Sequence, residues 1–204
     1  MAVLNGILTG GLFLAYLVLW KVKSNELKRK EGVEARVLEK STRPLQLYFG
    51  KMERRMTLAV VVIIFIHLFY KDTFSLTNYY APMDSVTFKF IGLILGGAGL
   101  TLSRMAQVIM GKSWRVGIDY LVKPGLVTRG IFRYIRNPTY SGIFLLIIGV
   151  WLINPTFLYA YWALAFYMLI ETQVRCEEEY LEEQYGEDYL EYFRSTKRYV
   201  PGVY

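Results

Sequence analysis

The chain has 204 residues, of which 54% are hydrophobic and 16% aromatic, and it carries a formal charge of +7. A high apolar content beside excess positive charge is typical of a membrane protein with basic flanks rather than of a soluble domain. The basic residues adjoin long apolar runs, which argues against nucleic acid as a partner. The single cysteine, Cys176, excludes an internal disulfide, and the absence of a Cys and His cluster argues against a metal site.

Three apolar runs predict the first membrane-spanning helices. They cover about residues 3–20, 56–70 and 88–110, and flanking basic side chains can lengthen the short second run. The first run lacks a basic start and a small-residue cleavage site, so we interpret it as a retained helix rather than a signal peptide. The third contains GLILGGAG, whose small residues allow another helix to pack closely.

Two shorter apolar runs, 142–153 and 156–170, predict a helical hairpin. Asn154 and Pro155 separate them, and Pro155 has no amide hydrogen for a continuous helix, so the pair predicts a sharp turn. The first run is too short to cross a bilayer unless its helix begins near Pro138. We therefore expect the hairpin to cover residues 138–172.

The tail, residues 173–204, alternates acidic with aromatic residues. Tyr180 and Tyr185 on one side of Gly186, and Tyr189 and Tyr192 on the other, have helical spacing. This pattern predicts two short amphipathic helices with a break at Gly186.

Basic residues set the expected orientation, because 22 of the 24 Lys and Arg residues lie in 21–55, 104–136 and the tail. The positive-inside rule makes that side cytoplasmic. The sequence therefore predicts an all-α, multi-pass integral membrane protein with five transmembrane helices, its N-terminus outside and its C-terminus, as a short helical tail, in the cytosol. We divide it into an N-terminal region, 1–110, with the cytosolic loop 21–55, and a core, 111–204.

The stretch RYIRNPTYSG, residues 133–142, precedes the hairpin and has two interpretations. In the structural one, Asn137 caps a helix, Pro138 occupies its first turn, and Arg133 and Arg136 anchor the chain at the membrane surface. In the functional one, a helix N-terminus beside arginines binds a carboxylate or a phosphate.

Two motifs around the hairpin, LVTRGIFRYIRNPTY and EEEYLEEQYGEDYLEY, resemble the isoprenylcysteine carboxyl methyltransferase family of integral membrane enzymes. The first is similar to the family's Leu-Val, Gly, aromatic, Arg-His-Pro-x-Tyr pattern, and the second to its Glu-Glu, Leu, aromatic-Gly, Tyr signature. The resemblance covers about the last hundred residues, and the first three spans add only topology to it.

The resemblance implies an S-adenosylmethionine site at the cytosolic face. Carried over by position, its residues are Pro124, Gly125, Leu126, Val127, Phe132, Asn137, Pro138, Thr139, Tyr140 and Glu178. Glu178 is expected to hold the cofactor's ammonium group, and Asn137 stands where the family has His. The family's substrate arginine falls at Gln173 in an ungapped alignment, so nearby Arg175 is the expected catalytic substitute.

The implied activity is methyl transfer from S-adenosylmethionine to the carboxylate of a lipophilic acceptor, either a prenylated cysteine or another amphiphile, among membrane lipids. A phospholipid amine or a small thiol stays open as the acceptor. An alternative starts from the ending KRYVPGVY, which with FRYIRNPTYSG is similar to the NADPH-dependent membrane sterol reductases. Those proteins have more spans than this chain. A third interpretation, a membrane adaptor without activity, gives the paired motifs no role.

Overall fold

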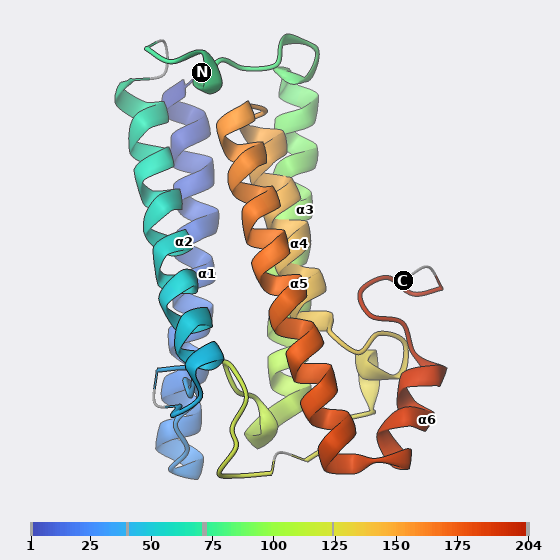
Figure 1. The fold of residues 1–204 in the computed structure, drawn as a ribbon. Helices are drawn as coiled ribbons and strands as arrows, with labels where there is room; N and C mark the ends of the chain where they lie inside the picture. Colours follow the sequence, from blue (N-terminus) through green and yellow to red (C-terminus); the bar gives the residue numbers. More distant parts are fainter. Residues whose placement is uncertain (1, 40, 71–72, 124, 203–204) are drawn as a thin grey trace.

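The computed structural model describes residues 2–39, 41–70, 73–123 and 125–202. The secondary-structure elements of this part of the chain are helices, without strands. Figure 1 shows the long helices side by side, with the short C-terminal helix beside one end of the bundle. The α-helices are α1 (Ala2–Glu31), α2 (Pro44–Phe69), α3 (Val86–Met110), α4 (Pro138–Ile153), α5 (Phe157–Tyr185) and α6 (Glu187–Ser195). Single 3-10 turns are η1 (Ser75–Thr77), η2 (Ala81–Met83), η3 (Gly111–Ser113) and η4 (Gly130–Arg133).

Each predicted span of the first half coincides with a helix, but α1 and α2 are longer than their apolar runs. α1 continues into its basic end as far as Glu31, and α2 begins at Pro44, whose fixed φ suits a first helical turn. α3 begins after Ser85, whose hydroxyl accepts a hydrogen bond from the Phe88 amide at 3.4 Å. Most of the predicted loop 21–55 is therefore helical, and only residues 32–43 connect α1 to α2.

The predicted hairpin is confirmed. α4 begins at Pro138 and ends at Ile153, and α5 begins at Phe157, so Asn154 and Pro155 form the turn between them. Thr156 caps α5 by accepting a hydrogen bond from the Tyr159 amide at 3.4 Å.

The prediction of two short helices in the tail is wrong for the first of them. α5 runs without interruption to Tyr185, because no glycine or proline breaks it before Gly186. The predicted break at Gly186 is confirmed, since this residue has a φ of +55° and separates α5 from α6. The hairpin's second helix and the first half of the tail are thus one rigid element.

Glycines bring α3 and α4 into close contact, as the small residues of the third run predicted. A Cβ added at Gly99 would meet the carbonyl oxygen of Gly142, and one at Gly149 would meet that of Gly92. Two helices approach this closely only where side chains are absent from both surfaces.

The outer surface of the bundle is consistent with a membrane protein. Two helical stretches, Val3–Glu31 and Val86–Ser113, are long and apolar enough to cross a membrane, and Pro138–Ile153 is a shorter apolar helix. Large apolar side chains such as Phe65, Phe90 and Leu164 are exposed, as expected of a surface that faces lipid.

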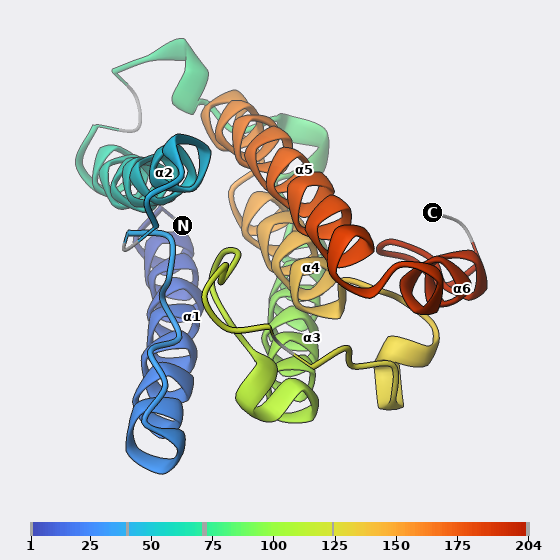
Figure 2. The same ribbon diagram turned by 60° about the horizontal axis from the view of Figure 1, so that its bottom comes forward.

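Two short parallel pairings join connections that are far apart in the sequence. Residues 35–37 pair with Val116 through two backbone hydrogen bonds, of 2.8 and 3.2 Å. Ile135 pairs with Lys197, which brings the end of the chain back to the start of α4. Figure 2 shows this end of the bundle from below, where the connection after α3 passes between α1 and α5.

We predict that Gly99→Ala destabilises the protein by about 1–3 kcal/mol, because the new methyl group must push α4 away. Gly97→Ala is the matched control, since a Cβ there meets nothing within 4 Å. Thermal unfolding of the purified protein in detergent compares the two variants. Equal midpoints for both would contradict the close packing of α3 and α4.

Candidate functional site

A cavity of about 410 Å³ lies at the end of the bundle where α5 meets α6. Its wall comes from both halves of the chain. α1 and α2 contribute Tyr16, Trp20, Glu53 and Thr57, and the connection between them contributes Arg36 and Glu39. The rest of the wall comes from the connection after α3 and from α4, α5 and α6. Its residues include Trp114, Arg115, Gly125, Leu126, Val127, Phe132, Arg136, Asn137, Pro138, Thr139, Tyr140, Ile143, Phe166, Glu177, Glu178, Tyr189 and Tyr192.

The structure brings together nine of the ten residues predicted to bind the cofactor. Gly125, Leu126, Val127, Phe132, Asn137, Pro138, Thr139, Tyr140 and Glu178 all line this cavity. Pro124 lies outside the described residues. The roles of these residues toward a ligand stay predictions.

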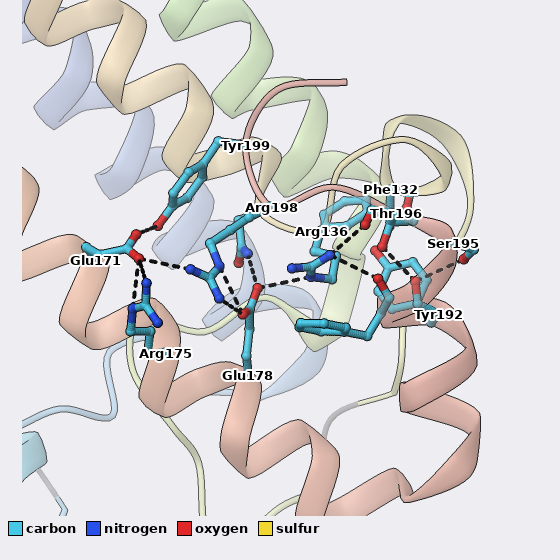
Figure 3. A network of polar contacts seen from close by, with 12 residues as sticks. Phe132, Arg136, Glu171, Arg175, Glu178, Tyr192, Ser195, Thr196, Arg198 and Tyr199 are labelled. Atoms are coloured by element: carbon cyan, nitrogen blue, oxygen red, sulfur yellow. Dashed lines mark hydrogen bonds and ion pairs between the residues drawn. The ribbon is translucent and has the colours of Figure 1, made fainter. Parts of the chain in front are cut away.

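Arg175, the predicted catalytic residue, is not among the residues that line the cavity. Its side chain is 59% exposed and pairs with Glu171, one turn earlier on α5, at 2.7 Å. Figure 3 shows the Arg175 guanidinium beside Glu171. Gln173, the other candidate, is buried and donates hydrogen bonds from Nε2 to the Tyr140 hydroxyl at 3.1 Å and to Glu177 at 3.0 Å. Neither residue is thus a cation at the cavity wall.

Asn137 stands at the N-cap position of α4, as predicted, and Pro138 is in the first turn. The predicted capping hydrogen bond is absent, which corrects the structural interpretation of this residue. The Asn137 amide instead donates from Nδ2 to Glu178 Oε1 at 2.9 Å. Asn137 therefore joins the start of α4 to α5.

Glu178 is the centre of an ion-pair network. Its Oε1 accepts from Arg136 Nε at 3.0 Å and from Asn137, and its Oε2 accepts from Arg198 Nε at 3.0 Å and Nη2 at 2.8 Å. Figure 3 shows the carboxylate of Glu178 between the guanidinium groups of Arg136 and Arg198. A carboxylate has about four lone-pair sites. All of them are occupied by protein donors here.

The end of the chain folds over the start of α4, and we call residues 196–199 the C-terminal strap. Backbone hydrogen bonds run from Arg136 to Lys197 at 2.8 Å and from Asn137 to Arg198 at 3.1 Å, with both amides donating to the strap. The Ser141 hydroxyl donates to the Tyr199 carbonyl at 2.8 Å. The strap thus fixes the turn that carries the predicted cofactor residues. Sequence analysis missed this role, since it used KRYVPGVY only for the reductase alternative.

Glu177 has a different environment from its neighbour. Its Oε1 accepts from Gln173 and from the Tyr140 hydroxyl, and its Oε2 only from the same hydroxyl, at 3.1 Å. No Lys or Arg of the described residues forms an ion pair with it. Burial raises the pKa of Glu177 above its usual range. Burial thus disfavours the charged carboxylate, and a cationic ligand group beside Glu177 would restore its charged form.

The first half of the chain, which added only topology to the family resemblance, also contributes residues to the cavity wall. Glu53 lies on α2 before the apolar run, and burial, together with the negative charge of Glu177, raises its pKa to about 7, although Arg36 opposes the shift. The Arg36 guanidinium lies 3.5 Å from Glu53. In the sequence these residues look like ordinary parts of a basic flank, so only the fold identifies them.

Comparison with known proteins identifies related sequences. A family model described as phospholipid methyltransferase matches residues 87–188, half of the chain. Protein-S-isoprenylcysteine O-methyltransferase A of Arabidopsis thaliana is 33% identical over 116 residues, which are 55% of this chain and 58% of that protein. The protein-S-isoprenylcysteine O-methyltransferase of Xenopus laevis is 32% identical over 132 residues, 62% of this chain and 46% of its own length. A probable protein-S-isoprenylcysteine O-methyltransferase of Oryza sativa subsp. indica is 28% identical over 119 residues, which are 56% of this chain and 62% of that protein. The chain thus spans less than two thirds of each of these relatives.

We predict that Glu178→Gln lowers the free energy of unfolding by an amount on the order of 3 kcal/mol. The substitution leaves two buried guanidinium groups facing each other without their shared anion. Glu179→Gln is the matched control, because Glu179 is exposed on the same helix. Unfolding in detergent measures both. A Glu178→Gln variant as stable as the control would contradict the role of this network in holding the strap.

Proposed function

Because the chain belongs to the phospholipid methyltransferase family, we propose that it is a membrane-embedded methyltransferase. It transfers a methyl group from S-adenosylmethionine to the carboxylate of a lipophilic acceptor, most like a C-terminal isoprenylcysteine. The observation that carries this proposal is a cavity whose polar end is formed by the predicted cofactor residues, next to a smaller apolar cavity, here called the apolar extension, that shares lining residues with it.

The main cavity is large enough for S-adenosylmethionine, and its polar end offers unused hydrogen-bonding groups. A volume of about 410 Å³ lies within the usual range for small-molecule sites, about 300–1,000 Å³. The hydroxyls of Thr139 and Tyr189 are buried at its wall and have no hydrogen-bond partner among the described residues. Buried polar groups without partners are costly unless a ligand satisfies them.

Glu177 is the better candidate for the cofactor's ammonium group, in place of Glu178. The four acceptor sites of Glu178 are occupied by Arg136, Asn137 and Arg198, whereas Oε2 of Glu177 keeps open lone pairs at the cavity wall. The charge of Glu178 is moreover balanced by two guanidinium groups, and that of Glu177 by none among the described residues. In this proposal Glu178 positions the start of α4 and the strap, and Glu177 contacts the ligand.

The apolar extension supports a lipid-tailed acceptor. A second cavity of about 50 Å³ lies between α1, α2, α4 and α5 and is lined mainly by apolar side chains. It shares Tyr16, Thr57, Ile143 and Phe166 with the main cavity. An acceptor whose tail starts in this extension and continues into the surrounding lipid would have its head group in the main cavity, where the predicted cofactor residues lie.

The mechanism needs no general base. When bound, S-adenosylmethionine supplies an electrophilic methyl group on a cationic sulfur. An acceptor carboxylate is already deprotonated near neutral pH, so the protein's task is to align the two groups and exclude water. Apolar and aromatic residues such as Tyr16, Trp20 and Ile143 limit water at the acceptor side. The negative charge of Glu177 stabilises the cationic ligand.

The proposed topology has α1 to α5 as five spans, with the N-terminus outside and the cavity and C-terminus in the cytosol. The distribution of Lys and Arg supports this orientation. The cavity then opens at the membrane surface, with the cofactor entering from water and the acceptor from lipid. Residues 111–204 supply most of the cofactor wall, and 1–110 part of the acceptor wall.

The reductase alternative has less support. The matched family and the relatives reported above are methyltransferases. The alternative depended on the ending KRYVPGVY, and its first three residues, Lys197, Arg198 and Tyr199, have a structural role in the strap.

Methyl transfer is tested with purified protein, methyl-labelled S-adenosylmethionine and an N-acetylated S-prenylcysteine. We expect label to enter the acceptor as a base-labile ester, because the carboxylate is the nucleophile. The same acceptor as its carboxamide should take up no label. Label on the carboxamide, or no label on either acceptor, would contradict the proposed reaction.

We predict that Glu177→Gln weakens binding of both S-adenosylmethionine and S-adenosylhomocysteine, by about 1.5–3 kcal/mol, because both ligands carry the ammonium group. Isothermal titration calorimetry in nanodiscs measures the two affinities, with Glu179→Gln as the control. Unchanged affinities in a folded Glu177→Gln variant would remove this residue from the ligand site.

A further inference from the structure

The carboxylate of the proposed acceptor needs a cation, and Arg175 does not line the cavity. The basic side chains among the described lining residues are Arg36, Arg54, Arg115 and Arg136. They differ in how many of their guanidinium N–H groups already donate hydrogen bonds within the protein. An arginine with unused N–H groups at the cavity wall is the candidate partner of the acceptor carboxylate.

Arg115 and Arg136 are held by the protein itself. The side chain of each is 8% exposed and pairs with one carboxylate, Asp119 and Glu178 respectively. One terminal nitrogen of each guanidinium also donates to two backbone carbonyls, at distances between 2.7 and 3.2 Å. Both residues therefore stabilise the wall of the cavity.

Arg54 is a weaker candidate than Arg36. Its side chain is 70% exposed, compared with 43% for Arg36, and its Nη2 lies 2.6 Å from Glu39, which also accepts from Arg36. Arg54 is thus the more solvated of the two, and a more solvated cation contributes less to binding.

Arg36 combines a fixed position with unused donors. Its backbone belongs to the pairing with Val116, and its neighbours Ala35 and Leu38 are buried, which anchors the segment. The Nε group donates to Glu39 at 2.9 Å and Nη2 to Glu53 at 3.5 Å, a long contact. The Nη1 group makes no hydrogen bond within the described chain. A guanidinium carries five N–H donors, so capacity is left for a second carboxylate.

The position of Arg36 also suits the head of a lipid-tailed acceptor. Its partner Glu53 lies one helical turn before Thr57, whose hydroxyl donates to the Glu53 carbonyl at 2.9 Å. Thr57 lines both the main cavity and its apolar extension. Arg36 therefore lies close to the opening through which an apolar tail would enter the bundle. The charge of Glu177 also acts on Glu53, so the acceptor side and the proposed cofactor side face each other.

We propose that Arg36 binds the carboxylate of the methyl acceptor and selects acidic over neutral acceptors. This inference rests on the proposed methyl transfer. In that step a carboxylate oxygen uses a lone pair to form the new C–O bond, the electrons of the S–C bond stay on sulfur, and no proton moves. The ester product is neutral and loses its ion pair with Arg36, which favours its release. Arg36 lies outside residues 87–188, so acceptor choice is set outside the segment that matches the family.

The test compares the affinities of an N-acetylated S-prenylcysteine and its carboxamide, measured by calorimetry in nanodiscs with S-adenosylhomocysteine present. We expect the wild type to prefer the carboxylate by about tenfold or more, the usual value of a charged hydrogen bond. Arg36→Gln should lose this preference and keep its affinity for S-adenosylhomocysteine. Arg36→Lys should keep part of the preference, because the charge remains. Arg55→Gln, at an exposed position outside the cavity wall, is the control.

The outcomes separate this proposal from the proposed function. A wild type that binds S-adenosylhomocysteine and prefers the carboxylate, with the preference kept in Arg36→Gln or lost in Arg54→Gln, overturns only the role of Arg36. A wild type that binds neither the adenosyl ligand nor the acceptor overturns both. Loss of S-adenosylhomocysteine binding in both Arg36 variants would assign Arg36 to the fold and also overturn the proposal.

Discussion

The shared ion pair at Glu178 is the interaction on which the rest of the site depends. One carboxylate on α5 holds Arg136 and Asn137 at the start of α4 and Arg198 on the C-terminal strap. Three segments that are separate in the sequence therefore meet at one buried charge. A buried carboxylate is stable only with such partners. The adjacent Glu177 lines the cavity and forms no ion pair within the part of the chain that the structure describes.

One wall of the cavity is formed by residues within the segment that matches the methyltransferase family, and the other by residues that precede this segment. Residues 87–188 include α3, α4, α5 and the predicted cofactor residues, whereas Arg36, Glu53 and Thr57 precede them. The pairing of residues 35–37 with Val116 holds the two walls together. In the proposed function, the cofactor and the acceptor would therefore contact different parts of the chain.

Much of the fold was predictable from local patterns. Apolar runs located the helices, and Asn154 with Pro155 located the hairpin turn, because the missing amide of proline acts within one or two residues. The motif around Asn137 also identified most of one cavity wall. Three features were not predictable. The pairing of Ile135 with Lys197 joins distant residues, Arg36 looks like a membrane flank, and Glu177 differs from Glu178 only by a rotation of about 100° around the helix. Each depends on tertiary geometry that no local pattern encodes.

The polar end of this cavity is proposed to bind an adenosyl cofactor. Direct titration of the purified wild-type protein with S-adenosylmethionine, S-adenosylhomocysteine and NADPH tests it without any knowledge of the acceptor. We expect both adenosyl ligands to bind with one site per chain, and NADPH to give no heat of binding. Binding of NADPH without binding of either adenosyl ligand would contradict the claim and favour a reductase.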